Sequence, residues 1–430
     1  MGKRIWTATM MALLCWSVIA VSQETSEPKI ALQGTISSEA EGKMEGVLVR
    51  AKKVGGTITV TVVSDSQGRY RFPASRLGPG TYRLSIRAVG YDLLASSSQV
   101  EILPNKAAQL DLKLGETKDL APQLMNAEWL MSLDKTPQSK GQVGKLDCVG
   151  CHSLTRVLSS KYSAESWHPV LERMANYGPG GRKLPFAVPT SPPDKEFTEW
   201  LSSVNLSSGD KHQYALKTLP RPRGRATRVV ITEFDVPNPG SEPHEVLVDP
   251  DGTVWYADFV RPNLLKMDPD TGQFREYRLP DLKPGFPAGS NCFEQDKEGN
   301  LWMAGLKQGG VFKFDRKTEK FSTWRLPFSD SAYSHAGCFI HSPDGSVWVR
   351  ETGSGGRSVQ YEHRLDPKTG QFTNYVPFPD NMTIIPAAER QPQGIGYLAG
   401  GFGDLSYHEE IAKQRRHQLY GSSIDSMGTY

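Results

Sequence analysis

The chain has 430 residues, a formal net charge of +3 and 23% charged residues. At about 100 to 200 residues per domain, this length predicts several domains. The near balance of positive and negative charge excludes a strong overall field for polyanions, so we expect no nucleic-acid partner.

The first residues predict export from the cytoplasm. Lys3 and Arg4 precede an apolar run over residues 5–21, and the small residues Ala20 and Ser22 stand at its end. A basic start, a short apolar stretch and small residues are typical of a secretory signal peptide. We therefore expect residues 1–22 to be removed and the mature protein to be periplasmic or secreted. No other stretch is long and apolar enough to span a bilayer, so we expect no membrane span after cleavage.

Residues 29–115 predict an all-β sandwich. Short stretches of alternating polarity, such as residues 57–62 and 82–86, are separated by turn residues. Residues 65–72 and 77–82 resemble the carboxypeptidase regulatory-like domain, a small transthyretin-like sandwich. The resemblance brings no catalytic residue. It implies an accessory module for carbohydrate or surface contact, and a simple spacer is the alternative.

Cys148, Cys151 and His152 form a Cys-x-x-Cys-His motif, which predicts covalent attachment of haem c. Each thiol can form a thioether with a vinyl group of the porphyrin, and the histidine can bind the iron as proximal ligand. A zinc site would need a second ligand pair, and a thioredoxin-like redox pair would need a flanking βαβ pattern. The sequence contains neither next to this motif.

Residues 116–207 resemble a small class I cytochrome c domain, in which helices surround the haem motif. We expect helices to begin after Ser163 and at Asp194, each with apolar residues at i, i+3 and i+4 spacing. Met174 is our candidate for the distal iron ligand, because a thioether would complete a His/Met site of raised potential. An ordinary core methionine, His168 as ligand, and a vacant sixth position are the alternatives.

A basic linker at residues 208–227, expected to be a solvated hinge, leads to a repeat over residues 228–379. An Asp/Glu-Gly-x-x-Trp motif begins at Asp251, Glu298 and Asp344, with spacings of 47 and 46 residues. A second turn motif follows in each unit. Two hairpins per unit and a period in the forties are typical of β-propeller blades, so we expect about three blades.

The end of the chain departs from this repeat. Residues 380–430 match neither turn motif, so we expect an atypical tail or a degenerate blade, and an incomplete propeller. Cys292 and Cys338 occupy equivalent positions in adjacent repeats. They could pair in an oxidising compartment, yet equivalent residues of neighbouring repeats often lie too far apart for a disulfide, so we expect two buried thiols.

The repeats resemble virginiamycin B lyase, the streptogramin-opening propeller family, at residues 232–237, 250–255 and 268–272. In that family a Glu-x-His element and a further histidine supply a metal site and the proton-abstracting base. The resemblance therefore implies Glu242 and His244 as catalytic residues with a divalent metal. The positions equivalent to His244 hold Asn291 and Gly337, so the partner histidine is missing, and those equivalent to Glu242 hold Gly289 and His335. His335 is either a complement to Glu242 and His244 or a structural hydrogen-bonding residue. Such an elimination needs both a base and a cation, which one Glu-x-His cannot supply alone.

The sequence thus predicts a multidomain, mainly β protein. A transthyretin/Ig-like β-sandwich and a partial or irregular β-propeller flank a small all-α cytochrome c-like domain. The first functional hypothesis is an exported c-type cytochrome that transfers electrons with a redox partner protein or a small-molecule donor, alone or as part of an oxidoreductase. Its propeller would serve as a binding or docking scaffold. The alternative is a lyase or hydrolase acting at the propeller mouth.

Overall fold

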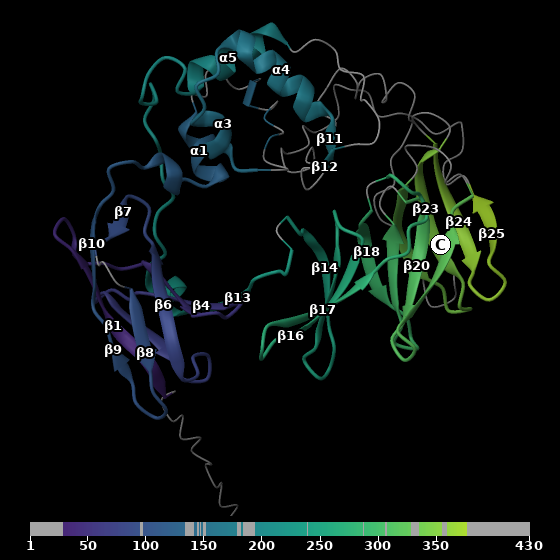
Figure 1. Cartoon of the computed structure of the whole chain (residues 1–430), viewed down its shortest axis with the longest axis horizontal. Helices are drawn as coiled ribbons and strands as arrows, with labels where there is room; N and C mark the ends of the chain where they lie inside the picture. Colours follow the sequence, from purple (N-terminus) through teal and green to yellow (C-terminus); the bar gives the residue numbers. More distant parts are fainter. Residues whose placement is uncertain are drawn as a thin grey trace, which may run out of the picture.

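The structure, a computed structural model, describes residues 29–94, 98–133, 142–143, 146, 148, 152–178, 182–183, 194–238, 240–286, 288–305, 308–327, 335–354 and 359–375. Figure 1 shows a β-sandwich, a small helical unit and a row of β-sheets, in chain order. The predicted signal peptide and the tail at residues 380–430 lie outside the described residues. Within these residues, no helix has both the length and the apolar character that crossing a membrane requires.

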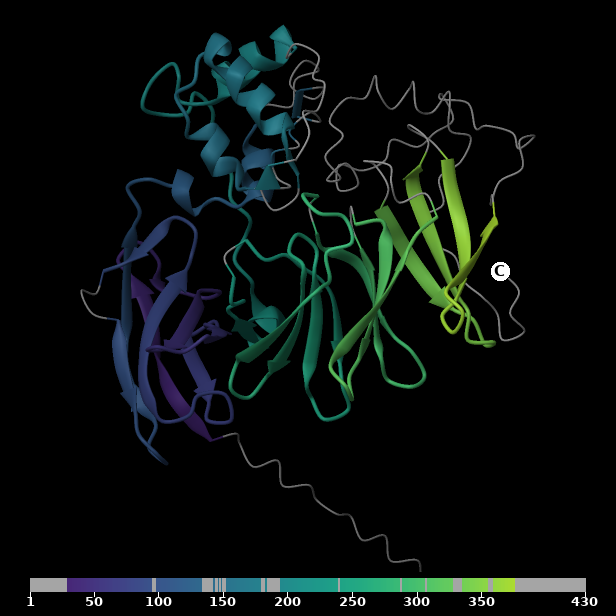
Figure 2. The same ribbon diagram turned by 45° about the vertical axis from the view of Figure 1, so that its right-hand side comes forward.

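The first part contains the strands β1 (Ile30–Ser38), β2 (Gly42–Lys43), β3 (Leu48–Lys53), β4 (Ile58–Val63), β5 (Arg69–Pro73), β6 (Gly80–Arg87), β7 (Tyr91–Leu93), β8 (Gln99–Ile102), β9 (Ala108–Gln109) and β10 (Leu112–Glu116). One sheet pairs β1 with β2, β5, β9 and β10, and β7 pairs with β10; the other contains β4, β3, β6 and β8 (Figure 2). Alternate side chains such as Val49, Phe72 and Leu84 are buried in one shared core. The predicted alternation of polarity therefore does form a two-sheet structure.

A strand from the expected start of the propeller belongs to this sandwich instead. The strand β13 (Val230–Phe234) pairs antiparallel with β4. Arg50 forms an ion pair with Glu233 at 3.2 Å, and Lys52 forms one with Asp235. The start of the propeller, predicted at residue 228, therefore lies later in the chain. A strand of alternating polarity can pair with any sheet edge whose backbone groups are unpaired. The propeller sheets begin only after β13.

The helical unit contains η1 (Ala121–Gln123), α1 (Asn126–Ser132), α3 (Leu154–Leu158), α4 (Ala164–Ala175) and α5 (Lys195–Val204), with a short hairpin of β11 (Tyr177–Gly178) and β12 (Arg182–Lys183). The hydroxyl of Ser163 accepts the backbone N–H of Ser166, and the carboxylate of Asp194 accepts that of Glu196. These caps start α4 and α5 where the sequence predicts helices. Apolar faces of all four α-helices share one core.

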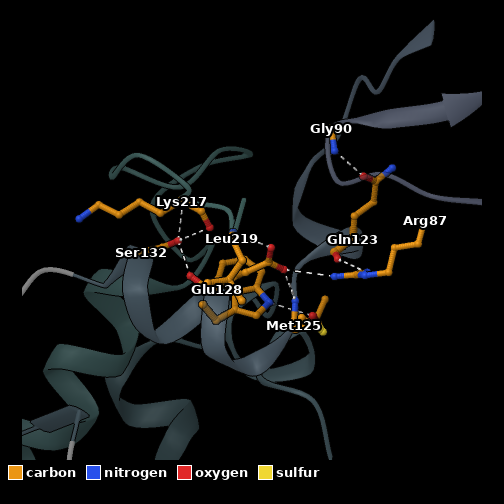
Figure 3. Close-up of polar contacts among 10 residues, drawn as sticks. Arg87, Gly90, Gln123, Met125, Glu128, Ser132, Lys217 and Leu219 are labelled. Carbon is orange, nitrogen blue, oxygen red and sulfur yellow. Dashed lines mark hydrogen bonds and ion pairs between the residues drawn. The ribbon is translucent and has the colours of Figure 1, made fainter. Parts of the chain in front are cut away.

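A buried carboxylate joins the helical unit to the other segments (Figure 3). The side chain of Glu128 on α1 is 1% exposed. Its Oε2 accepts the backbone N–H of Met125 at 2.9 Å and lies 3.4 Å from Nη2 of Arg87, on β6 of the sandwich. Its Oε1 accepts the backbone N–H of Leu219, in the predicted linker, at 3.0 Å. These donors compensate the cost of burying a charged group.

The predicted linker contacts both the helical unit and the sandwich. The backbone N–H of Lys217 donates to the hydroxyl of Ser132 at 2.7 Å, and that of Gly224 donates to Glu45 at 2.9 Å. Arg221 forms an ion pair with Glu41. The expectation of a solvated hinge is therefore wrong here, because acidic and hydroxyl groups distant in sequence accept its donors.

The remaining strands are β14 (Pro243–Val248), β15 (Val254–Asp258), β16 (Asn263–Asp268), β17 (Gln273–Arg278), β18 (Ser290–Gln295), β19 (Leu301–Gly305), β20 (Gly310–Asp315), β21 (Lys320–Arg325), β22 (His335–His341), β23 (Val347–Ser354), β24 (Val359–Asp366) and β25 (Gln371–Tyr375). They form three four-stranded antiparallel sheets, each in sequence order. Within the described residues, these three sheets have the four-stranded content that the repeat predicts for each blade.

Consecutive blades pack face to face, but one face of the first blade is open. Phe293 and Phe339, at equivalent positions of the second and third blades, are only 4% and 1% exposed. The first blade has Val246 at this position, 54% exposed, and Val248 beside it is 65% exposed. Within the described residues, the arc of blades therefore has no neighbour that covers this face.

Replacing Glu128 by alanine tests the junction. We expect Glu128→Ala to lower the free energy of unfolding by about 3 kcal/mol, because it leaves Arg87 and two backbone N–H groups without their acceptor. Glu172→Ala, on an exposed position of α4, should change it by less than about 0.5 kcal/mol. Urea denaturation followed by tryptophan fluorescence measures both. Equal changes in unfolding free energy for the two variants would contradict the stabilising role of Glu128 at the junction.

Phe293 and Val246, at equivalent positions of two blades, allow a second comparison of a buried and an exposed side chain. Phe293→Ala should destabilise the protein by about 3 to 5 kcal/mol, because it leaves a cavity between two blades. Val246→Ala removes an exposed side chain and should cost less than about 0.5 kcal/mol. If both variants lost a comparable amount of unfolding free energy in the same denaturation experiment, another segment would have to cover Val246.

Candidate functional site

The Cys-x-x-Cys-His segment lies at the amino end of α3. The backbone N–H of His152 donates to the carbonyl oxygen of Cys148 at 3.3 Å, which is the spacing of one helical turn. Cys148 packs against the apolar core of the helical unit. Cys151, the second predicted thioether position, lies outside the described residues. The turn therefore brings the first predicted thioether residue and the predicted proximal ligand together.

The imidazole of His152 is held by its own loop. Nδ1 lies 3.2 Å from the carbonyl oxygen of Ser153. A proton on Nδ1 makes this a hydrogen bond and leaves the lone pair of Nε2 available to a metal. The hydroxyl of Ser153 caps α3 by accepting the backbone N–H of Thr155, and the N–H of Leu154 donates to Asn126 on α1 at 2.8 Å. The loop is thus fixed to two helices.

Buried polar atoms near this core lack partners. The indole nitrogens of Trp167 and Trp200 and the side-chain oxygen of Gln142 are buried without a hydrogen-bond partner among the described residues. Such groups cost about 1 to 3 kcal/mol each when they stay unpaired. Cys148 at the apolar core and the oriented imidazole of His152 are the kinds of group that hold covalently bound haem. In this respect the described residues fit haem.

Met174 and His168, the two predicted candidates for a distal ligand, both lie on α4. Met174 is 37% exposed, so it is not a buried core methionine. His168 is half-buried. The assignment of Met174 as distal ligand stays a prediction.

Glu242 and His244 lie at the start of the first blade. The backbone N–H of Glu242 donates to Asp258 at 3.3 Å, and its carbonyl oxygen accepts the N–H of Phe259 at 2.9 Å. The ring of His244 stacks on Phe259, with centroids 4.9 Å apart. Nδ1 of His244 lies 3.8 Å from a carboxylate oxygen of Glu245.

Two of the positions equivalent to Glu242 and His244 in the next blades are closely packed glycines. A Cβ atom at Gly289, the equivalent of Glu242, would lie 1.9 Å from the carbonyl oxygen of Phe259. One at Gly337, the third-blade equivalent of His244, would lie 2.8 Å from Nε of Arg350. A larger side chain at Gly289 would clash with the backbone, whereas one at Gly337 would require the side chain of Arg350 to move. Neither glycine supplies a ligand side chain.

The structure adds two carboxylates that the sequence analysis missed. Glu245 is half-buried, its Oε2 accepts the backbone N–H of Phe293, and burial raises its pKa. Solvent reaches Glu294, yet the surrounding protein and then the charge of Glu245 raise the pKa of Glu294 to about 7. A carboxyl group that is half protonated near neutral pH can give or take a proton. The repeat itself held no signal for this role.

Cys292 and Cys338 form a disulfide with Cα atoms 5.1 Å apart. The expectation of two buried thiols is therefore wrong. The first strands of adjacent blades, β18 and β22, lie in direct contact. Equivalent residues on these first strands are therefore close enough to form a disulfide.

Residues 31–115 match the family model of the carboxypeptidase regulatory-like domain. This match gives a carboxypeptidase regulatory-like domain at the predicted place. No curated protein matches the chain. The matched region is a minor part of the 430 residues, so it assigns no activity to the whole protein.

Several solved structures are similar to part of the chain. A catalytically inactive virginiamycin B lyase from Staphylococcus aureus with quinupristin is 19% identical, with a TM-score of 0.28, over 35% of this chain and 46% of that one. A streptogramin B lyase is 17% identical, with a TM-score of 0.24, over 35% and 60%. An auxiliary nutrient binding protein from Bacteroides thetaiotaomicron is 16% identical, with a TM-score of 0.22, over 39% and 35%. Each likeness covers less than two thirds of the other protein and carries no argument about activity.

The two carboxylates give a prediction with a defined sign. Glu245→Gln should lower the pKa of Glu294 from about 7, because it removes the neighbouring negative charge. At pH 7 a larger fraction of Glu294 is then ionised. Glu298→Gln, which changes an exposed turn residue, is the matched control and should leave the pKa of Glu294 unchanged. Carbon-13 NMR titration of the glutamate carboxyl groups measures both, and an unchanged Glu294 in Glu245→Gln would contradict the coupling.

Proposed function

We propose that the protein is an exported c-type cytochrome that binds haem covalently and transfers electrons. The observation that supports this most is the loop in which the imidazole of His152 is oriented by Ser153 beside Cys148. A histidine whose Nδ1 donates to a backbone carbonyl presents Nε2 in a fixed direction, which is the usual arrangement of a metal-ligating histidine.

Each residue of the motif has a defined task in this proposal. Cys148 and Cys151 supply the two thioether bonds, and His152 supplies the proximal iron ligand through Nε2. Met174 is the proposed distal ligand. When bound, haem c supplies a reversible one-electron couple whose potential depends on its axial ligands.

The helices around the loop limit its movement. The indole N–H of Trp129 on α1 donates to the hydroxyl of Thr155 on α3 at 2.9 Å, and Nε2 of His212 lies 3.0 Å from the carbonyl oxygen of Leu158. These contacts fix α3, and with it the position of His152. A ligand held by rigid elements keeps its geometry during a change of charge, which favours fast electron exchange.

The other parts have supporting tasks in the proposal. Export would follow from residues 1–22, and a periplasmic or secreted location would give access to a redox partner protein or a small-molecule donor. The blades would act as a docking or binding scaffold, and the sandwich as a contact module for carbohydrate or a surface.

A second candidate function is a lyase or hydrolase at the start of the first blade, with Glu242, His244 and a divalent metal. The pKa of Glu294, raised to about 7, favours it, because such a carboxyl group suits general acid–base catalysis. Asn291 and Gly337, at the positions where that family would need a partner histidine, speak against its metal site.

Variants of the axial ligands separate the two functions. In protein matured in a host with a cytochrome assembly system, dithionite should produce sharp α and β absorption bands, and His152→Ala should lose them. Met174→Ala should keep the haem but lower the reduction potential, because the thioether raises it. His168→Ala, on the same helix, is the matched control and should change neither. Metal-dependent turnover of a cyclic ester that persists in His152→Ala would favour the second candidate.

A further inference from the structure

The first strands of the three blades bring together side chains from equivalent positions. Glu245, Cys292 and Cys338 lie on β14, β18 and β22, at spacings of 47 and 46 residues. A carboxylate oxygen of Glu245 and the two Sγ atoms all lie within 4.8 Å of one another. The repeat therefore gathers one hard and two soft ligand atoms in one place.

The surrounding residues hold Glu245 and Cys292 in place and leave Cys338 accessible to solvent. Cys292 is 3% exposed and belongs to the core between the second and third blades. Cys338 is exposed. Oε2 of Glu245 accepts the backbone N–H of Phe293, while Oε1 lies 3.8 Å from Nδ1 of His244. A reductant can therefore reach Cys338, and the carboxylate stays oriented.

We propose that reduction of the Cys292–Cys338 disulfide creates a binding site for a divalent cation of the Zn²⁺ class. Its protein ligands are Sγ of Cys292, Sγ of Cys338 and a carboxylate oxygen of Glu245, and water completes the shell. Two thiolates with one carboxylate and one water form a tetrahedral set that Zn²⁺ and Co²⁺ accept. The proposal concerns the blades alone and does not rest on haem binding.

The distances suit such a site. Zinc binds sulfur at about 2.3 Å and carboxylate oxygen at about 2.0 to 2.2 Å. Ligand atoms of a tetrahedral site with these bond lengths lie roughly 3.5 to 3.8 Å apart. The three atoms already lie within 4.8 Å of one another, so small side-chain rotations suffice.

The reduction is a thiol–disulfide exchange with a dithiol reductant. One thiolate of the reductant attacks the exposed Sγ of Cys338, which breaks the bond to Cys292 and forms a mixed disulfide. The second thiol of the reductant then attacks the reductant's own sulfur in this mixed disulfide, releases Cys338 and leaves the reductant as a cyclic disulfide. Two electrons pass to the protein, and the thiol protons go to solvent when the cation binds the two thiolates.

Cobalt titration tests the proposal. The Cys148→Ser/Cys151→Ser variant of the whole chain removes the other cysteine pair and serves as the background. After treatment with a dithiol and its removal under nitrogen, Co²⁺ should produce a thiolate-to-cobalt charge-transfer band with one equivalent bound. The oxidised form of the same protein should give no such band.

Further substitutions in this background identify the ligands. Cys292→Ser should abolish the two-thiolate spectrum, and Glu245→Gln, which keeps both thiols, should weaken binding by at least about tenfold. Glu298→Gln, on an exposed turn of the second blade, is the matched control and should leave binding unchanged. A disulfide that resists the dithiol, a reduced protein without the band, or a Glu245→Gln variant with unaltered affinity would each overturn the proposal. Loss of haem binding in separate experiments would leave it untouched.

Discussion

The arrangement of the sandwich and the helical unit depends on the buried carboxylate of Glu128. Its two oxygens accept backbone N–H groups from α1 and from the segment that leads to the blades, and one of them meets Arg87 of the sandwich. The side chain of Glu128 is only 1% exposed, and a buried charge is tolerated only where hydrogen-bond donors surround it. The three segments that supply these donors therefore have to meet at Glu128. The same helix carries Trp129 and Asn126, whose side chains hold α3 and the loop of His152. The junction therefore also supports the candidate haem site.

Local features of the chain could be predicted because their causes lie close together in sequence. Ser163 and Asp194 cap helices that begin where the sequence places them, since a cap needs only the next few backbone N–H groups. The turn motifs after Val248 and Asp268 likewise close hairpins within one blade. The Cys-x-x-Cys-His motif is local in the same sense, so Cys148 and His152 could be singled out without knowing the fold.

The features that the sequence analysis got wrong or missed all involve partners far apart in the chain. The strand β13 pairs with β4, about 170 residues away, and Arg221 pairs with Glu41. Cys292 and Cys338 are joined because neighbouring blades converge at their first strands, which the repeat spacing alone does not reveal. Glu245 and Glu294 are linked by the same packing, and its effect on the pKa of Glu294 depends on surrounding atoms that no motif encodes.

We propose that the protein is exported and carries haem through two thioether bonds beside His152. The most direct test of this proposal is the intact mass of mature protein made in a host with a cytochrome assembly system. The account predicts the mass of the polypeptide without residues 1–22 plus one haem, and the bare polypeptide mass for the Cys148→Ser/Cys151→Ser variant. A colourless wild-type protein with the mass of its residues alone would contradict the account.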